Sequence, residues 1–341
     1  MNGLRVLVTG GAGFIGSELV RQLVSSGAEV TVIDNLVNGK RENLADVPGV
    51  NLVTADIRDC AAVRGALNSI DIVYHLACLG VRHSIHSPVE NHDVNATGTL
   101  NLLKWSKLVG VRRFVFVSTS EVYGTASTVP MTEAHPTLPM TVYGASKLAG
   151  ESYTRAFFRT YGFPTVVLRP FNSFGPRCHH EGDCGEVIPK FLLRALGGQP
   201  MIIFGDGAQT RDFTYVRDTA MGILAAGVAD GVIGDTLNLG SGCEITINEL
   251  ARTVCRITGR QSTVQYADSR PGDVLRLCSD STNARHLLAF EPQVTLEQGL
   301  AHLKAWYQER GLTPAELLQA EKPRNWEAGS ETDAKGLFAS V

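Results

Sequence analysis

Three groups of residues in this chain have types and spacings that can do chemistry. A glycine-rich segment, TGGAGFIG, runs from Thr9 to Gly16, Thr119 lies in the segment STSEVYG, and Tyr143 and Lys147 stand four residues apart in YGASK. On a helix, residues four apart share one face. A lysine ammonium stabilises a phenolate there and brings the tyrosine pKa, ordinarily about 10, closer to neutral. We therefore expect Tyr143 to remove a proton from a substrate hydroxyl, with Thr119 sharing that proton.

The glycine-rich segment predicts a dinucleotide site because it follows an apolar strand and opens a helix. Gly10 permits the tight turn, Gly13 lets the backbone approach a pyrophosphate, and Gly16 lets the helix pack on the strand. The helix N-terminus offers free N–H groups to phosphates. Asp34 ends the next strand, where a carboxylate accepts both ribose hydroxyls and repels a 2′-phosphate. Asn35 follows it rather than an arginine, so NAD is favoured over NADP.

Further residues at the ends of the expected strands are assigned to the same cofactor. Asp56 contacts the adenine edge or caps a helix, and both interpretations stay open. His75 is expected to pack in the core. Besides Asp34, Asn35 and the three glycines, the predicted cofactor contacts are Phe14, Ile15, Asn38, Gly39, Asp56, Ile57, Leu76, Ala77, Asn95, Ser118, Tyr143, Lys147 and Pro170.

The elements that position these residues alternate between short apolar runs and helical patterns, which is typical of βαβ units. This predicts an α/β fold with a doubly wound parallel (Rossmann) sheet and a smaller C-terminal substrate-binding domain. The cofactor domain is expected over 1–170 and about 218–262, the second domain over about 171–217 and 263–320, and a flexible tail over 322–341. Strands are expected at Arg5–Thr9, Glu29–Asp34, Asn51–Thr54, Ile72–His75, Arg113–Ser118, Thr165–Arg169 and Thr236–Leu239, and helices at Gly16–Ser26, Asn95–Val109, Tyr143–Tyr161 and Ile247–Thr258.

Composition narrows the classes of partner. The net charge of −3 argues against a general nucleic-acid or anionic-membrane surface, and no apolar stretch reaches the length of a spanning helix. Seven scattered cysteines and the absence of a signal-peptide pattern favour a cytoplasmic protein. The segment Cys178–Cys184 has no ordinary zinc spacing, so no metal is expected and a substrate loop is favoured.

Taken together, the ordered motifs resemble those of the extended short-chain dehydrogenase/reductases, in the NAD-dependent nucleotide-sugar epimerase/dehydratase family. The resemblance covers roughly residues 3–310 and includes His75-Leu-Ala77, Arg169-Pro-Phe-Asn172, Gln209–Val216 and Arg270-Pro-Gly-Asp273. It implies that a UDP-sugar is the substrate and that the protein is a homodimer formed through the helices at 95–109 and 143–161. The substrate contacts it implies are Arg82, Thr119, Ser120, Glu121, Tyr143, Asn172, Arg177, Val187, Lys190, Phe204, Arg211, Arg270 and Asp273.

Within these contacts the resemblance assigns separate roles. Asn172, Arg211 and Arg270 would contact the diphosphate, and Asp273 the nucleotide ribose. Val187 and the neighbouring Ile188-Pro-Lys-Phe191, which includes Lys190, would form the wall around the base together with Phe204. Fixed arginine charges suit a diphosphate because they bind it bidentately.

The triplet Thr119-Ser120-Glu121 bears on which reaction follows formation of a 4-keto sugar. The 4,6-dehydratases of the family carry Thr-Asp-Glu and use the aspartate as an acid. This chain has Ser120 at that position and so lacks the acid, and its Thr-Ser-Glu resembles the triplet of UDP-glucuronate decarboxylases. Glu121 is counted as catalytic, with a structural carboxylate as the alternative. Segments Ala77–Pro88 and Val94–Leu100 resemble epimerases instead.

The favoured prediction is therefore a 4-epimerase of UDP-glucose, UDP-N-acetylglucosamine or UDP-glucuronate. A decarboxylase, a dehydratase that uses Glu121 as the C5 base, and a non-enzymatic NAD-binding protein are the alternatives. Arg177 either pairs with a sugar carboxylate or is an ordinary loop arginine.

Overall fold

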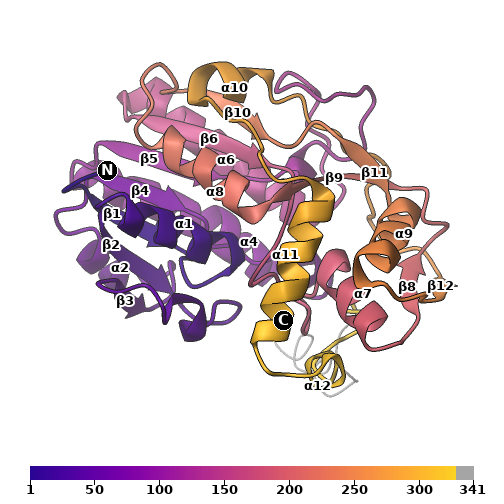
Figure 1. The fold of residues 1–341 in the computed structure, drawn as a ribbon. Coiled ribbons are helices and arrows are strands. Elements are labelled where there is room, and N and C mark those ends of the chain that lie inside the picture. Colours follow the sequence, from indigo (N-terminus) through magenta and orange to yellow (C-terminus); the bar gives the residue numbers. More distant parts are fainter. Residues whose placement is uncertain (328–341) are drawn as a thin grey trace, which may run out of the picture.

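The larger part of the protein is built on a seven-stranded parallel sheet (Figure 1). The computed structural model describes residues 1–327. The strand order is β10-β6-β5-β4-β1-β2-β3, so the order reverses between β1 and β4, where a ligand crevice is expected. The strands are β1 (Arg5–Thr9), β2 (Glu29–Asp34), β3 (Asn51–Thr54), β4 (Ile72–His75), β5 (Arg113–Val117), β6 (Thr165–Pro170) and β10 (Thr236–Leu239).

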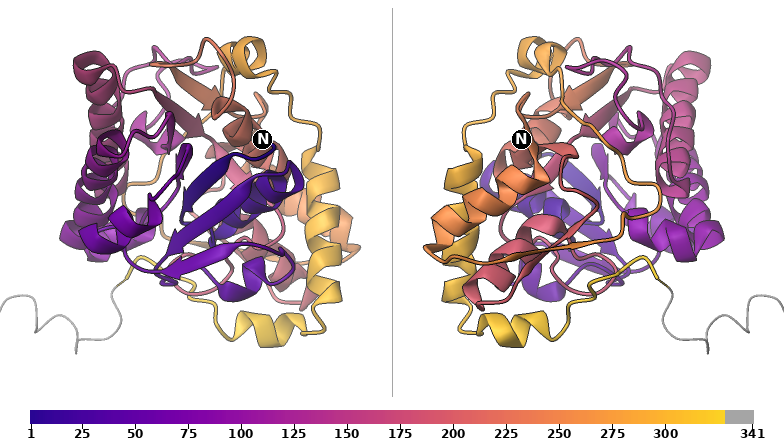
Figure 2. Two further views of the ribbon diagram at one scale, coloured as in Figure 1. Left: turned by 90° about the vertical axis from the view of Figure 1, so that its left-hand side faces the viewer. Right: turned by 90° about the vertical axis from the view of Figure 1, so that its right-hand side faces the viewer.

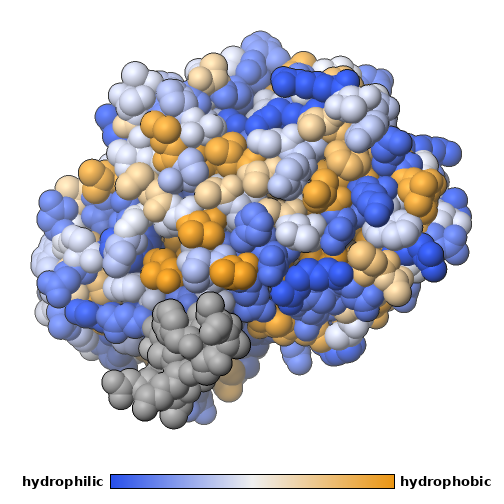
Figure 3. Space-filling model, turned by 180° about the vertical axis from the view of Figure 1, so that it is seen from behind, coloured by the Kyte–Doolittle hydropathy of each residue, from blue (hydrophilic) through white to orange (hydrophobic). Residues whose placement is uncertain are grey.

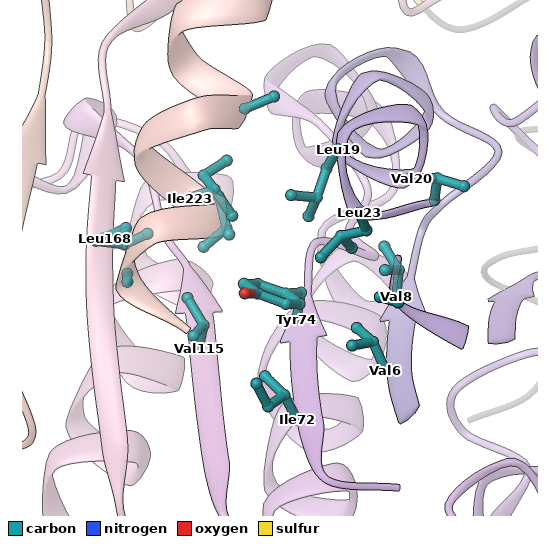
Figure 4. Close-up of a cluster of buried hydrophobic side chains, with 14 of the residues drawn as sticks. Val6, Val8, Leu19, Val20, Leu23, Ile72, Tyr74, Val115, Leu168 and Ile223 are labelled. Carbon is teal, nitrogen blue, oxygen red and sulfur yellow. The ribbon is translucent and has the colours of Figure 1, made fainter. Parts of the chain in front are cut away.

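Helices cover both faces of this sheet (Figure 2). Alternate residues of β1 point to opposite faces: Val6 and Val8 pack with one set of helices, and Leu7 packs with the other. The first set is α1 (Phe14–Ser25), α8 (Val216–Ala226) and α10 (Thr282–Leu288), and Figure 4 shows part of its core around the fully buried Tyr74. The second set is α2 (Cys60–Ala66), α5 (Gly98–Leu108) and α6 (Val142–Tyr161). Such a three-layer doubly wound sheet confirms the predicted fold class.

A smaller part lies beyond the carboxyl ends of the sheet strands and has a core of its own. It holds a three-stranded sheet of order β11-β9-β7 and a parallel pair, β12-β8. Its strands are β7 (Asn172–Phe174), β8 (Met201–Phe204), β9 (Thr210–Tyr215), β11 (Glu244–Thr246) and β12 (Val264–Ala267). Its helices are α7 (Val187–Leu196), α9 (Ile247–Thr258), α11 (Leu296–Glu309) and α12 (Pro314–Leu318), while α3 (Val81–His86) and α4 (Pro88–His92) join the first part.

Helix α9 was expected in the cofactor domain, but it packs in the smaller part. Its apolar face, with Leu250 and Val254 fully buried, contacts α7 and α11. The reason is topological, because the chain leaves the large sheet directly after β10 and β11 pairs antiparallel with β9. Conversely, α10 returns to the large sheet, where it packs beside β10.

The expected flexible tail is also corrected in part. Within residues 322–327, Asn325 (2% exposed) and Trp326 (9% exposed) are packed against the rest of the protein, while the other four residues are exposed. Residues 328–341 of that prediction lie outside the described residues. No helix within residues 1–327 is long and apolar enough to cross a membrane. On the face seen in Figure 3, apolar side chains are interspersed with polar ones.

Candidate active site

A cavity of about 900 Å³ lies at the carboxyl ends of the sheet strands. The residues that follow β1, β2, β4, β5 and β6 line one half, and α7, β8 and β9 of the smaller part line the other. This is the crevice predicted from the reversal of strand order, and its size is at the upper end for ligand pockets. The site therefore lies between the two parts of the protein.

The glycine-rich loop forms the floor of the first half because larger residues would not fit there. Gly10 has a φ of 71°, and a Cβ on it would lie 2.7 Å from the backbone nitrogen of Ala77. A Cβ on Gly16 would overlap the carbonyl oxygen of Gly10. Helix α1 begins after Gly13 with no side-chain cap, so its first N–H groups are free for a phosphate.

Asp34, at the end of β2, lines the same half of the cavity. Its carboxylate is 7% exposed and accepts hydrogen bonds from the N–H groups of Ala12 (3.0 Å) and Leu36 (2.9 Å). Burial raises the pKa of Asp34, and these two hydrogen bonds oppose the rise. Together, the loop and this carboxylate fit a dinucleotide without a 2′-phosphate.

Asp56 lines the cavity beside this carboxylate. Its Oδ2 accepts a hydrogen bond from Asn35 Nδ2 (3.0 Å), and Arg58 binds both of its oxygens at 2.9 Å. The helix-cap interpretation is wrong, because Asp59 caps α2 by accepting hydrogen bonds from the first N–H groups of that helix. The pKa of Asp56 is held below its ordinary value mainly by the hydrogen bond from Arg58.

Every predicted cofactor residue except Asn95 lines the cavity. Asn95 is 1% exposed and is used for internal contacts. Its Nδ2 donates to the carbonyl oxygen of Leu79 (2.9 Å) and to Ser146 Oγ (3.1 Å), while its Oδ1 accepts from the N–H of Leu79 (2.8 Å). Its role is therefore to hold the segment after β4 against α6.

Tyr143, Lys147 and Thr119 all line the cavity, and Thr119 is hydrogen-bonded to Tyr143. Lys147 is 1% exposed, and its Nζ donates to the carbonyl oxygen of Val117 at the end of β5 (2.7 Å). Burial raises the pKa of Tyr143 well above its ordinary value, the nearby Cys78 adds to this, and a hydrogen bond with Thr119 opposes it. Burial also lowers the pKa of Lys147. This is the set of groups expected for removing a proton from a hydroxyl.

The second half of the cavity gathers charged groups. Asp273 binds the guanidinium of Arg211 (2.7 Å) and that of Arg270. Among the described residues, Arg270 Nε and Asn172 Oδ1 are buried without a hydrogen-bond partner. Buried polar atoms of this kind are costly unless a ligand satisfies them, so this part of the wall suits a polar, anionic ligand.

Glu121 faces the same arginines from the turn after β5. Burial raises its pKa, and the positive charges of Arg211 and Arg270 oppose that rise. Arg82 and Glu186 line the same cavity, where burial lowers the pKa of Arg82 to about 10 and raises that of Glu186. The cavity thus holds two carboxyls whose neutral forms are favoured by desolvation.

Two predicted substrate contacts do not reach the cavity. Ser120 is buried in the turn after Thr119 and does not line it. Arg177 pairs with Glu18 and donates to Ser17 Oγ (3.1 Å), so it fastens its loop to α1 and is not available for a sugar carboxylate. The other predicted substrate residues all line the cavity: Arg82, Thr119, Glu121, Tyr143, Asn172, Val187, Lys190, Phe204, Arg211, Arg270 and Asp273.

Sequence reasoning missed several residues of the wall. Glu186 is the N-cap residue of α7, directly before the predicted base wall, and this position was a signal that was overlooked. Cys184 lines the cavity from the segment expected to be a substrate loop. The C-terminal residues Lys322, Asn325 and Trp326 also line it, and no motif marked them.

The chain is similar to known proteins over most of its length. The family model described as GDP-mannose 4,6 dehydratase matches residues 7–303. The chain is 36% identical to a putative UDP-glucose 4-epimerase of Methanocaldococcus jannaschii, covering 90% of this chain and all of that one. It is 35% identical to UDP-glucuronic acid decarboxylase 1 of Arabidopsis thaliana, covering 92% of this chain and 72% of that one.

A solved structure resembles this one over nearly the same length. It is the UDP-glucuronic acid 4-epimerase of Bacillus cereus in complex with UDP-glucuronic acid and NAD, with a TM-score of 0.85 and 31% identity over 90% of this chain and all of that one. Fold, cavity and sequence therefore agree that the chain belongs to the NAD-dependent nucleotide-sugar epimerase and dehydratase family of extended short-chain dehydrogenases/reductases.

Proposed function

We propose that this protein is an NAD-dependent 4-epimerase of UDP-sugars. The observation that carries the proposal is that Tyr143, Lys147 and Thr119 line the same cavity as the glycine-rich loop and the arginine pair, with Thr119 hydrogen-bonded to Tyr143. One half fits the dinucleotide and the other fits an anionic nucleotide. The similarity to a putative UDP-glucose 4-epimerase over that protein's full length supports the same reaction.

The chain's own residues handle the proton of the substrate. When bound, NAD supplies reversible hydride transfer at C4 of the sugar. Tyr143, as the phenolate, accepts the proton of the 4-hydroxyl, and the Thr119 hydroxyl orients that group. The Lys147 ammonium stabilises the phenolate. After the 4-keto sugar has turned over, Tyr143 returns the proton to the oxygen at the inverted carbon.

The nucleotide must stay bound while the sugar turns over. Arg211 and Arg270 provide fixed positive charge for the diphosphate, and Asn172 lies on the same wall. Because Asp273 holds both guanidinium groups, they are preorganised and lose little freedom when the ligand binds. The sugar itself needs fewer contacts, which leaves it free to rotate.

A UDP-glucuronate decarboxylase is the second candidate. Glu121 supports it because this carboxyl lines the cavity beside the arginines, and the Arabidopsis relative is such a decarboxylase. A dehydratase is disfavoured, since Ser120 provides no acid and does not face the cavity. In the epimerase, Glu121 has a binding role toward the arginine-bound substrate.

Proton NMR in deuterated water tests the proposal with UDP-glucose, UDP-N-acetylglucosamine and UDP-glucuronate as separate substrates. Inversion at C4 without deuterium at C5 is expected for at least one of them. Loss of the C6 carbon from UDP-glucuronate would instead identify the decarboxylase, and deuterium at C5 with the C6 carbon retained would identify elimination chemistry. Tyr143→Phe, which keeps the ring but removes the base, is expected to abolish turnover and retain NAD.

We also propose that the protein is a homodimer that pairs α5 and α6 of two copies. The ends of these helices expose apolar side chains, Leu108 at 69% and Tyr161 at 57%. A monomeric mass by light scattering would contradict this assembly.

A further inference from the structure

The segment after α12 crosses the second half of the cavity. We refer to residues 321–326 as the C-terminal strap, and five of its residues line the cavity: Glu321, Lys322, Pro323, Asn325 and Trp326. The family model that matches the chain ends at residue 303, before the strap begins. The strap therefore adds a wall that the shared motifs do not contain.

Two residues of α7 fasten the beginning of the strap. Glu321 accepts from Arg194 through both carboxylate oxygens, at 3.0 and 2.9 Å, and both side chains are nearly buried. One turn earlier on α7, Lys190 Nζ donates to the carbonyl oxygen of Lys322 (2.7 Å). A buried ion pair made through two hydrogen bonds fixes the relative orientation of the two side chains as well as the distance between them. The strap is thus docked along a helix that itself lines the cavity.

Asn325 fastens the end of the strap to the loop before α7. Its side-chain amide is 2% exposed, and Nδ2 donates to the carbonyl oxygens of Gly185 (3.0 Å) and Asp183 (3.2 Å). Lys322 Nζ also pairs with the Asp183 carboxylate (2.9 Å). Several polar contacts in six residues are far more than a frayed terminus makes. They place Trp326 in one position.

Trp326 packs on Phe204, the residue at the end of β8 that the family resemblance assigns to the base wall. The two ring centroids are 4.7 Å apart at 84°, and Trp326 is 9% exposed while still lining the cavity. Edge-to-face contact fixes the plane of the indole relative to the phenyl ring. The cavity therefore ends in a rigid corner made of two aromatic side chains.

We infer that Trp326 is a nucleotide-binding residue and that its indole contacts the pyrimidine base of the substrate in the corner it forms with Phe204. This rests on the proposed function, since it takes the substrate to be a UDP-sugar. The occupant is a planar aromatic base, because two aromatic side chains offer stacking and edge contacts but no charge. The cationic groups Arg211 and Arg270 line the same half of the cavity for the diphosphate.

Calorimetric titration of the full-length, NAD-loaded protein with UDP tests the inference directly. Trp326→Ala is expected to weaken UDP binding about tenfold, and Trp326→Phe to restore most of that loss because it keeps an aromatic face. Pyrophosphate, which has no base, is the control ligand, and its affinity is expected to be equal in all three proteins. An unchanged UDP affinity in Trp326→Ala would overturn the inference, as would an equal loss for pyrophosphate.

Intrinsic fluorescence provides a second measurement, which does not depend on a destabilising substitution. The chain has three tryptophans, and Trp105 and Trp306 do not line the cavity. UDP is expected to change the emission of the native protein and to have little effect on Trp326→Phe. A UDP response that persists undiminished in Trp326→Phe would contradict the contact.

A pair of truncations separates the strap from the residues that follow it. A chain ending at Ala320 lacks the strap, and one ending at Glu327 keeps it. The first is expected to show weakened UDP binding, and the second native binding. These assays do not require turnover, so a protein that binds UDP through Trp326 but fails to invert C4 would refute the proposed reaction alone. A protein that epimerises a UDP-sugar with affinity independent of Trp326 would refute the strap inference alone.

Discussion

Replacing Lys147 with methionine tests the central acid–base argument. Methionine keeps much of the side-chain length but removes the ammonium, which donates to the carbonyl oxygen of Val117 and lies 4.5 Å from the ring centroid of Phe116. Burial already raises the pKa of Tyr143 well above its ordinary value. Without the cation one helical turn away, the phenolate loses the main charge expected to stabilise it.

The size of the effect follows from that spacing. Side chains one turn apart are separated by about 6 Å, and two unit charges at that distance interact by about 3 kcal/mol at an effective dielectric constant of about 20. This corresponds to about two pKa units. Tyr143 is a base only as the phenolate, so a higher pKa leaves less of the active form at neutral pH. We expect kcat to fall about 100-fold in Lys147→Met, with the acid limb of the pH profile about two units higher.

The assay is C4 inversion of the accepted UDP-sugar by NMR, measured from about pH 6 to about pH 10 to span the phenolate titration. Bound NAD is quantified in parallel, because Lys147 also lines the cofactor half of the cavity. A variant that retains NAD and shows an acid limb at the native pH would refute the role assigned to Lys147. Loss of activity at every pH in proportion to lost NAD would assign it to cofactor binding instead.

Three further changes test other parts of the structure. Gly16→Ala is expected to weaken NAD binding at least tenfold, because its Cβ would overlap a backbone oxygen of the same loop. The control is Gly65→Ala in α2, where a Cβ meets nothing within 4 Å; it is expected to keep the native NAD affinity and to alter stability by no more than about 1 kcal/mol. Equal NAD affinities of the two variants in a fluorescence titration would contradict this. Glu151→Gln removes the carboxylate that Arg169 binds at 2.8 and 2.7 Å, and we expect the free energy of unfolding at neutral pH to fall by about 3–5 kcal/mol in urea denaturation. Burial raises the pKa of Glu151, but the hydrogen bonds from Arg169, Ser118 and Arg155 and the positive charge of Arg169 together outweigh burial and hold the pKa below its ordinary value of 4.5. The stabilisation is therefore present above pH 4.5 and is lost as the pH falls through the folded-state pKa. A difference in unfolding free energy between wild type and variant that does not narrow in acid would be evidence against it. Arg177→Ala is expected to leave KM for every UDP-sugar unchanged, and a selective rise for UDP-glucuronate would restore the carboxylate-binding role that its ion pair with α1 argues against.

The sequence predicted what is local and missed what depends on distant contacts. The glycine loop, Asp34 and Tyr143 all follow strand ends or helix starts, and the ends of parallel strands meet at one edge whatever surrounds them. Arg177 was misassigned because a loop arginine finds its partner through tertiary packing, here on α1. Asn95 likewise sits beside the cavity, but its amide is used up by internal hydrogen bonds.

The C-terminal strap is a second example of structure that depends on contacts with residues far away in the sequence. Nothing in the polar stretch after residue 321 signals order, because the groups that fix it come from α7 and from the loop before it, more than 120 residues earlier in the chain. Helix α9 was assigned to the wrong part for a related reason. Its amphipathic pattern shows that one face is buried but does not say against which neighbour.

The strand order has a consequence for the protein during synthesis. β6 is buried along its whole length. Within residues 1–327, one of its edges pairs with β10 alone, which the ribosome makes about 70 residues later. At about 5–20 residues per second, that edge stays unpaired for roughly 4–14 s. An open apolar strand edge is a template for pairing with other chains. The nascent chain is therefore most exposed to aggregation and to chaperone binding in this interval, and chains that terminate before residue 236 are expected to remain in that state.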